Sequence, residues 1–136
     1  MSKEIWINLP VKDVSKSREF FRNIGFNIDP QHNTEHMAAI SFGDGKVMIM
    51  LFPEAVFEGF IQSKIADTTL GNETLFSFGA DSIEEVDETA AKVKAAGGIL
   101  YGEPSLRDGW MYGFGMVDPD GHRWNMLYMD MSKLPK

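Results

Sequence analysis

The feature that most constrains the fold is an internal repeat, because the same order of predicted elements occurs twice. In each half an alternating strand precedes an amphipathic helix, and three more strands follow, the last two joined by a turn that contains Asp-Gly. Aligning the turn at residues 44–45 with the turn at 120–121 places Met50-Leu51 opposite the identical pair Met126-Leu127. The repeat therefore predicts two β-α-β-β-β modules and an α+β fold.

Local signals set the bounds of these elements. In the first half a helix is expected between Asp13, a typical N-cap, and Gly25. In the second half a helix begins at the S-x-x-E capping box of Ser82 and ends at Gly97-Gly98. The predicted strands are short apolar or alternating segments, at residues 5–11, 26–28, 37–42 and 47–52 and again at 74–80, 99–101, 111–117 and 123–128.

The two modules fit one domain, which we expect to span residues 1–136. The first module covers about 4–52 and the second about 73–130, with a linker at about 53–72 between them. Within the linker Phe57 and Phe60 follow the spacing of an amphipathic helix. We interpret this segment either as a packed linker or as a lid over a pocket.

Composition excludes several classes of function. The formal net charge is −7 and no basic cluster offsets it, so the phosphates of a nucleic acid would be repelled. The chain has no Cys, which removes disulfides and thiolate chemistry. The longest apolar run, residues 47–52, is too short to cross a membrane. No signal-peptide pattern follows the polar residues 1–4, so we expect a cytoplasmic protein.

Two motifs resemble signatures of a known family. Residues 9–13, Leu-Pro-Val-Lys-Asp, followed by Ser17, Phe20-Phe21 and Gly25-Phe26, resemble the opening signature of the vicinal oxygen chelate superfamily. Residues 118–124, Asp-Pro-Asp-Gly-His-Arg-Trp, resemble its closing signature. This superfamily contains glyoxalase I, extradiol dioxygenases, fosfomycin-modifying enzymes and bleomycin-resistance proteins. The resemblance implies a mixed sheet that curls around a cleft, and a homodimer, but it does not fix the activity.

The resemblance also implies where a catalytic metal would bind. Enzymes of the superfamily hold a divalent cation with about four His and Glu side chains. Here the corresponding positions carry other residue types, namely Trp6, Ile49 or Met50, Thr74 or Leu75, and Asn125. Indole, thioether and alkyl groups cannot replace the water that a cation loses on binding. We therefore predict no metal ligand, no cofactor and no assigned catalytic residue.

The residues that replace the ligands favour a binding protein for a small apolar or planar molecule. We predict that the ligand-binding residues are Trp6, Asn8, Met50, Phe57, Phe60, Tyr112 and Asn125. The alternative is a metal-dependent lyase, isomerase or dioxygenase of the glyoxalase type with atypical ligands and a divalent metal. A third interpretation is a regulatory or structural domain whose cleft is filled by side chains. The sequence does not identify the ligand.

Overall fold

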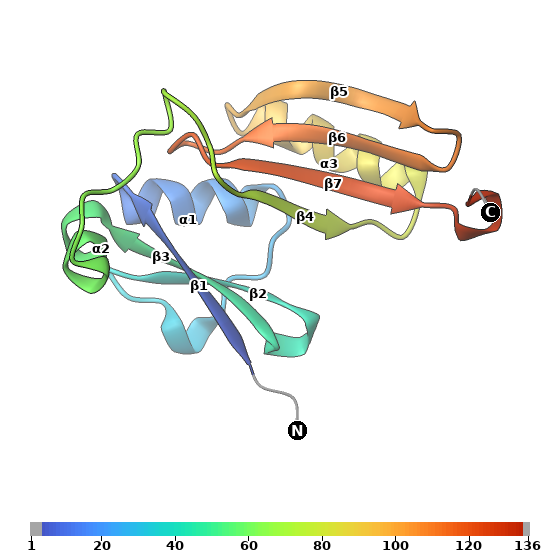
Figure 1. Ribbon diagram of the computed structural model, residues 1–136. Coiled ribbons are helices and arrows are strands. Elements are labelled where there is room, and N and C mark those ends of the chain that lie inside the picture. The colour runs from blue at the N-terminus through green and yellow to red at the C-terminus, as the bar shows by residue number, and fades with distance from the viewer. Residues whose placement is uncertain (1–3, 135–136) are drawn as a thin grey trace. The chain divides into compact units, whose positions relative to one another are not determined.

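The computed structural model describes residues 4–134, and its elements follow the predicted order (Figure 1). The chain divides into two compact units, Met1–Asp67 and Thr68–Lys136. Each unit contains one mixed sheet with helices, which confirms the predicted α+β class and the two-module plan. None of the helices between residues 4 and 134 is both long and apolar enough to span a bilayer.

The first unit is built on a three-stranded sheet in the order β1-β3-β2, with β1 parallel to β3 and β2 antiparallel to it. Its elements are β1 (Ile5–Val11), α1 (Val14–Asn23), β2 (Ala38–Phe42), β3 (Val47–Pro53) and α2 (Glu54–Ile61). The prediction of a strand at residues 26–28 is wrong, because this segment makes only an isolated bridge, between Ile28 and Ile40.

Helix α1 begins where the sequence predicts, because the Asp13 side chain accepts a hydrogen bond from the backbone N–H of Lys16. Gly25 follows the helix with a φ of 99°, a conformation that favours glycine. The buried face of the helix carries Phe20 and Phe21. The buried face of the sheet is formed by alternate strand residues, namely Leu9 and Val11 of β1, Ile40 of β2, and Ile49 and Leu51 of β3.

The second unit is built on a four-stranded sheet in the order β4-β7-β6-β5, in which β4 is parallel to β7 and the other pairs are antiparallel. Its elements are β4 (Leu75–Gly79), α3 (Ile83–Ala95), β5 (Ile99–Arg107), β6 (Met111–Val117) and β7 (Arg123–Met129). Helix α3 covers one face of this sheet (Figure 1). On that face lies a buried core of Phe114, Met116, Trp124 and Met126, together with Val86, Ala90 and Val93.

The closing sequence motif holds this core in place. The Asp118 carboxylate accepts hydrogen bonds from the indole N–H of Trp124, at 3.1 Å, and from the backbone N–H groups of Asp120 and His122. Burial raises the pKa of Asp118, while His122 and these hydrogen bonds act in the opposite direction. The motif therefore fixes the turn between β6 and β7 and orients the largest buried side chain of the unit.

The identical Met-Leu pairs do not occupy equivalent positions in the two sheets. Met50 pairs with Asn8 on the face opposite the buried Leu51. Met126 lies instead in the core, and Leu127 is on the opposite face of the sheet. Because side chains alternate along a strand, a shift of one residue reverses every side chain. Apart from the strand at residues 26–28, the repeat therefore predicts the order of the strands and helices of the two modules correctly, but it misaligns their last strands by one residue.

Candidate functional site

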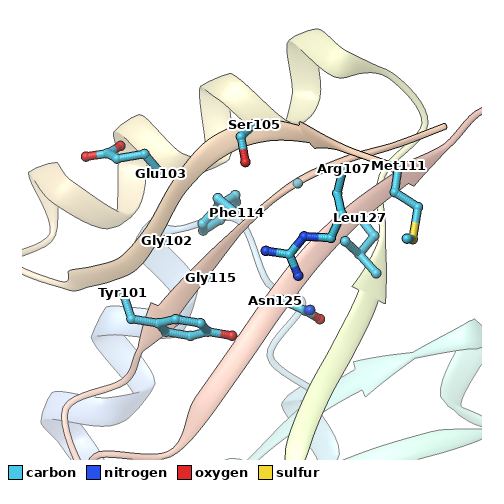
Figure 2. Close-up of a pocket in the computed structure, with 11 residues that line it drawn as sticks. Tyr101, Gly102, Glu103, Ser105, Arg107, Met111, Phe114, Gly115, Asn125 and Leu127 are labelled. Atoms are coloured by element: carbon cyan, nitrogen blue, oxygen red, sulfur yellow. The ribbon is translucent and has the colours of Figure 1, made fainter. Parts of the chain in front are cut away.

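The face of the second sheet opposite α3 contains a pocket with a volume of about 270 Å³ (Figure 2). Strand register places Gly115 beside Asn125 and Gly113 beside Leu127, so these four residues share that face. Strand β5 forms the wall of the pocket, with Tyr101, Glu103, Ser105 and Arg107 among the lining residues. The pocket is thus formed entirely within the second unit.

The floor of the pocket is the side formed by β6 and β7, and two of its β6 positions are glycines. A Cβ added to Gly115 would lie 2.7 Å from Cε2 of Tyr101 and closer still to Cζ and Cε1. A Cβ added to Gly113 would lie 2.7 Å from Cδ2 of Leu127 and would also meet the carbonyl oxygen of Met126. Glycine at these positions therefore lets the Tyr101 ring and the Leu127 side chain lie directly against the sheet backbone.

The wall of the pocket depends on irregular pairing in β5. Its register with β6 shifts between Leu100 and Gly102 and again between Gly102 and Ser105. Pro104 lies within the second shift, where its missing N–H breaks no regular ladder bond. Beyond the shifts Arg107 pairs with Met111. Figure 2 shows the Arg107 side chain reaching back across β6 toward β7.

A cation–π contact supports the aromatic side of the pocket. The guanidinium carbon of Arg123 lies 4.7 Å from the centroid of the Tyr101 ring. The ring is therefore held between this cation and the Gly115 backbone. Its hydroxyl group points toward β7 (Figure 2). Tyr101 thus presents its edge and its hydroxyl group to the pocket.

Two polar groups of the pocket lack partners within the part of the chain that the structure describes. The side-chain oxygen Oδ1 of Asn125 is buried and accepts no hydrogen bond there. No carboxylate of residues 4–134 forms an ion pair with the Arg107 guanidinium. The Asn125 oxygen is buried, and buried polar atoms almost always have a partner, whereas Arg107 is exposed. The pocket therefore has the polar groups to bind a ligand that supplies both a donor and an acceptor.

Tyr112 does not share this face, so the prediction that it lies beside Asn125 in one site is wrong. Its hydroxyl group donates a hydrogen bond of 2.7 Å to Asp87 of α3. This bond raises the pKa of Tyr112. The reason is strand alternation, because Gly113 and Gly115 face the pocket and the residues between and beside them face the helix. Asn125 alone among the predicted residues lines the pocket.

The other predicted site residues belong to the first unit. Trp6, Asn8 and Met50 share one face of its sheet, and the Trp6 side chain is 66% exposed. Phe60 of α2 is also exposed and packs edge-to-face on Phe52, with centroids 5.0 Å apart. Phe57 is half-buried. Their role in binding a ligand stays a prediction.

The sequence analysis missed Tyr101, Glu103, Ser105 and Arg107. The predicted strand ends at residue 101, and Gly102 and Pro104 beyond it are poor strand formers. A usable signal was present in the alternation of larger polar side chains at every second position from Tyr101 to Arg107. A second signal was the pair Gly113 and Gly115, which must face the same side of a strand.

The donors of the pocket do not fit the divalent metal found in enzymes of the vicinal oxygen chelate type. Asn125 offers a neutral carboxamide, and the Arg107 guanidinium would repel a cation. Glu103 forms an ion pair of 2.9 Å with Lys94 of α3, and its side chain points away from Arg107 (Figure 2). Between residues 4 and 134 no group of three or more His, Asp or Glu side chains is placed to hold a metal ion.

Comparisons with known proteins agree with the fold. A family model described as the glyoxalase/bleomycin resistance protein/dioxygenase superfamily matches residues 5–126. The solved structure of a hypothetical protein from S. aureus is 34% identical, with a TM-score of 0.81, and the match covers 94% of this chain and 95% of that chain. A comparison with curated proteins gives no match.

Two more distant structures share the fold. Lactoylglutathione lyase from Agrobacterium tumefaciens is 18% identical, with a TM-score of 0.65 and 94% of each chain covered. TnmS3, an antibiotic-binding protein from Streptomyces sp. CB03234, is 15% identical, with a TM-score of 0.66, and the match covers 96% of this chain and 98% of that chain. From the family match, the strand topology and the turn motif, we conclude that this chain belongs to the glyoxalase/bleomycin resistance protein/dioxygenase superfamily.

Proposed function

We propose that the protein binds a small planar molecule in the pocket of its second unit and does so without a catalytic metal. The observation that carries this proposal is Asn125, whose buried side-chain oxygen has no partner among the described residues. It stands where the metal enzymes of the superfamily are expected to carry Glu. A neutral amide binds and orients an organic molecule through hydrogen bonds, but it is a poor anchor for a divalent cation.

The shape of the pocket supports a flat ligand. Because Gly113 and Gly115 carry no side chain, the Tyr101 ring and the Leu127 side chain lie close to the sheet backbone, and Leu127 and Met111 provide apolar contacts. The volume of about 270 Å³ is just below the usual range for ligand sites, which favours a small molecule. Function would be stoichiometric capture. TnmS3, which is named for antibiotic binding, has the same fold, so capture requires no change of architecture.

We also propose that the protein acts in the cytoplasm as a homodimer. The dimer is supported by large apolar side chains that the first unit leaves exposed, such as Ile5 at 58% and Trp6 at 66%. A role of Trp6, Asn8, Met50, Phe57 and Phe60 in ligand binding is a separate proposal, because these residues lie in the first unit. Trp6→Ala tests it, because we expect this variant to weaken ligand binding.

The proposal is tested by NMR titration of the isotope-labelled protein with 3-hydroxybenzamide, a planar neutral molecule with hydroxyl and N–H donors, in the presence of EDTA. We expect the amide signals of Gly113 and Gly115 to shift. Asn125→Ala should weaken binding about tenfold, the value of one hydrogen bond of about 1.4 kcal/mol. Tyr112→Phe is the matched control, because Tyr112 faces α3, and it should leave binding unchanged. Binding that appears only when a divalent metal is added would instead support a metal enzyme.

A further inference from the structure

The charges around the pocket indicate the charge of the ligand, in addition to its planar shape. The guanidinium of Arg107 offers a fork of N–H donors that matches a carboxylate. No acidic side chain of residues 4–134 pairs with it. A cation that lines a cavity and has no internal counter-ion is available to an anionic ligand.

The acidic residue that lines the pocket does not neutralise Arg107. Glu103 is paired with Lys94 at 2.9 Å. Figure 2 shows the Glu103 carboxylate and the Arg107 guanidinium pointing in different directions from β5. A second cation, Arg123, lies against the Tyr101 ring on the same face of the sheet. The local balance at the pocket is therefore positive.

This local balance is opposite to that of the whole chain, whose formal net charge is −7. The overall field repels anions, so an anion can be concentrated here only by nearby cations. The Tyr101 hydroxyl, which points toward β7 (Figure 2), provides a further donor in the lining of the same pocket. The Oδ1 atom of Asn125 has no partner among residues 4–134 and is a hydrogen-bond acceptor. It therefore requires a donor from the ligand.

We propose that the ligand is a small planar organic acid, whose carboxylate binds Arg107 and whose hydroxyl or N–H group donates to Asn125. This inference rests on the proposed function, since it assigns the chemical class of the molecule bound in the same pocket. It predicts a preference for an acid over a neutral amide of the same shape. Two bonds from the guanidinium fork are charge-assisted and stronger than those between neutral groups.

The test compares 3-hydroxybenzoate with 3-hydroxybenzamide by NMR titration of the full chain, with the Gly113 and Gly115 amides as reporters. The wild-type protein should bind the acid at least tenfold more tightly than the amide. Arg107→Gln should abolish this preference. Lys92→Gln removes the same charge from the exposed surface of α3 and should leave the preference intact. Arg107→Lys, which keeps the charge but loses the fork, should retain part of the preference.

The outcomes separate this inference from the proposed function. Equal affinities for the two compounds, or a preference that survives in Arg107→Gln, would overturn the organic-acid inference while the binding function stands. The organic-acid inference would also be overturned if Lys92→Gln reduced the preference for the acid as much as Arg107→Gln does, because the preference would then come from the net charge of the protein. If neither compound shifts the two glycine signals at millimolar concentration, both the inference and the proposed function are wrong.

Discussion

Gly115→Ala probes the floor of the pocket most sensitively. The new Cβ would lie 2.5 Å from Cε1 of Tyr101 and closer still to Cζ, whereas ordinary contacts begin at 3.4 Å, so the ring must move by more than 3.4 − 2.5 = 0.9 Å. The ring is 43% exposed and can swing outward without displacing the backbone. This movement weakens the contact with Arg123, which is worth about 0.5–1 kcal/mol at an exposed site.

The substitution has an opposing effect on the unfolded chain, because replacing glycine by alanine stabilises by about 0.4–1 kcal/mol. The net change in the free energy of unfolding is therefore small, and a double-mutant cycle with Tyr101→Ala is needed to isolate the clash. We expect Gly115→Ala to destabilise the protein by about 1 kcal/mol more when Tyr101 is present than when it is absent. Urea denaturation measures all four free energies.

Gly79→Ala is the matched control, since Gly79 lies in the same sheet and no atom stands within 4 Å of its added Cβ. It should be neutral or slightly stabilising in both backgrounds. A cycle in which Gly115→Ala has the same effect with and without Tyr101 would refute the reasoning, because the ring would then not lie against the glycine.

Three further predictions concern stability and assembly. Trp124→Phe removes the N–H donor to the buried Asp118 and leaves a small cavity, so urea denaturation should show a loss of about 2 kcal/mol or more; a loss below about 0.5 kcal/mol would contradict the structural role of the motif. Lys94→Ala breaks the ion pair with Glu103, in which both side chains are more than half exposed. Thermal denaturation should therefore show that the free energy of unfolding falls by less than about 1 kcal/mol, and a larger loss would show that the pair is not a surface contact. Light scattering should give twice the chain mass of 15.3 kDa, and a value equal to that mass would exclude the dimer.

Local signals account for what the sequence predicted correctly. The caps at Asp13 and Ser82 both form hydrogen bonds to the first turn of their helices, and each depends only on residues three positions apart. The turn at residues 118–121 is likewise defined by its own side chains. Such features can be read from a single sequence because they do not depend on the rest of the fold.

Non-local pairing accounts for what the sequence did not predict. The extent of β5 depends on two register shifts against β6, which no property of residues 99–107 alone specifies. The assignment of Tyr112 to the pocket failed for a related reason, since one residue of difference along β6 separates the pocket face from the helix face. Asn125 lines the pocket, and the closing motif fixes its position relative to Gly121, whereas its role in binding stays a prediction.

The central claim is that this pocket binds an organic molecule without a catalytic metal, and metal analysis of the purified protein tests it most directly. The chain should be expressed in medium that contains divalent metals, purified without chelators and measured by inductively coupled plasma mass spectrometry. Because a neutral amide and a guanidinium are poor partners for a cation, we expect far less than one metal ion per chain and unchanged binding of 3-hydroxybenzamide after EDTA treatment. A near-stoichiometric divalent metal that EDTA removes, together with loss of ligand binding, would contradict the account.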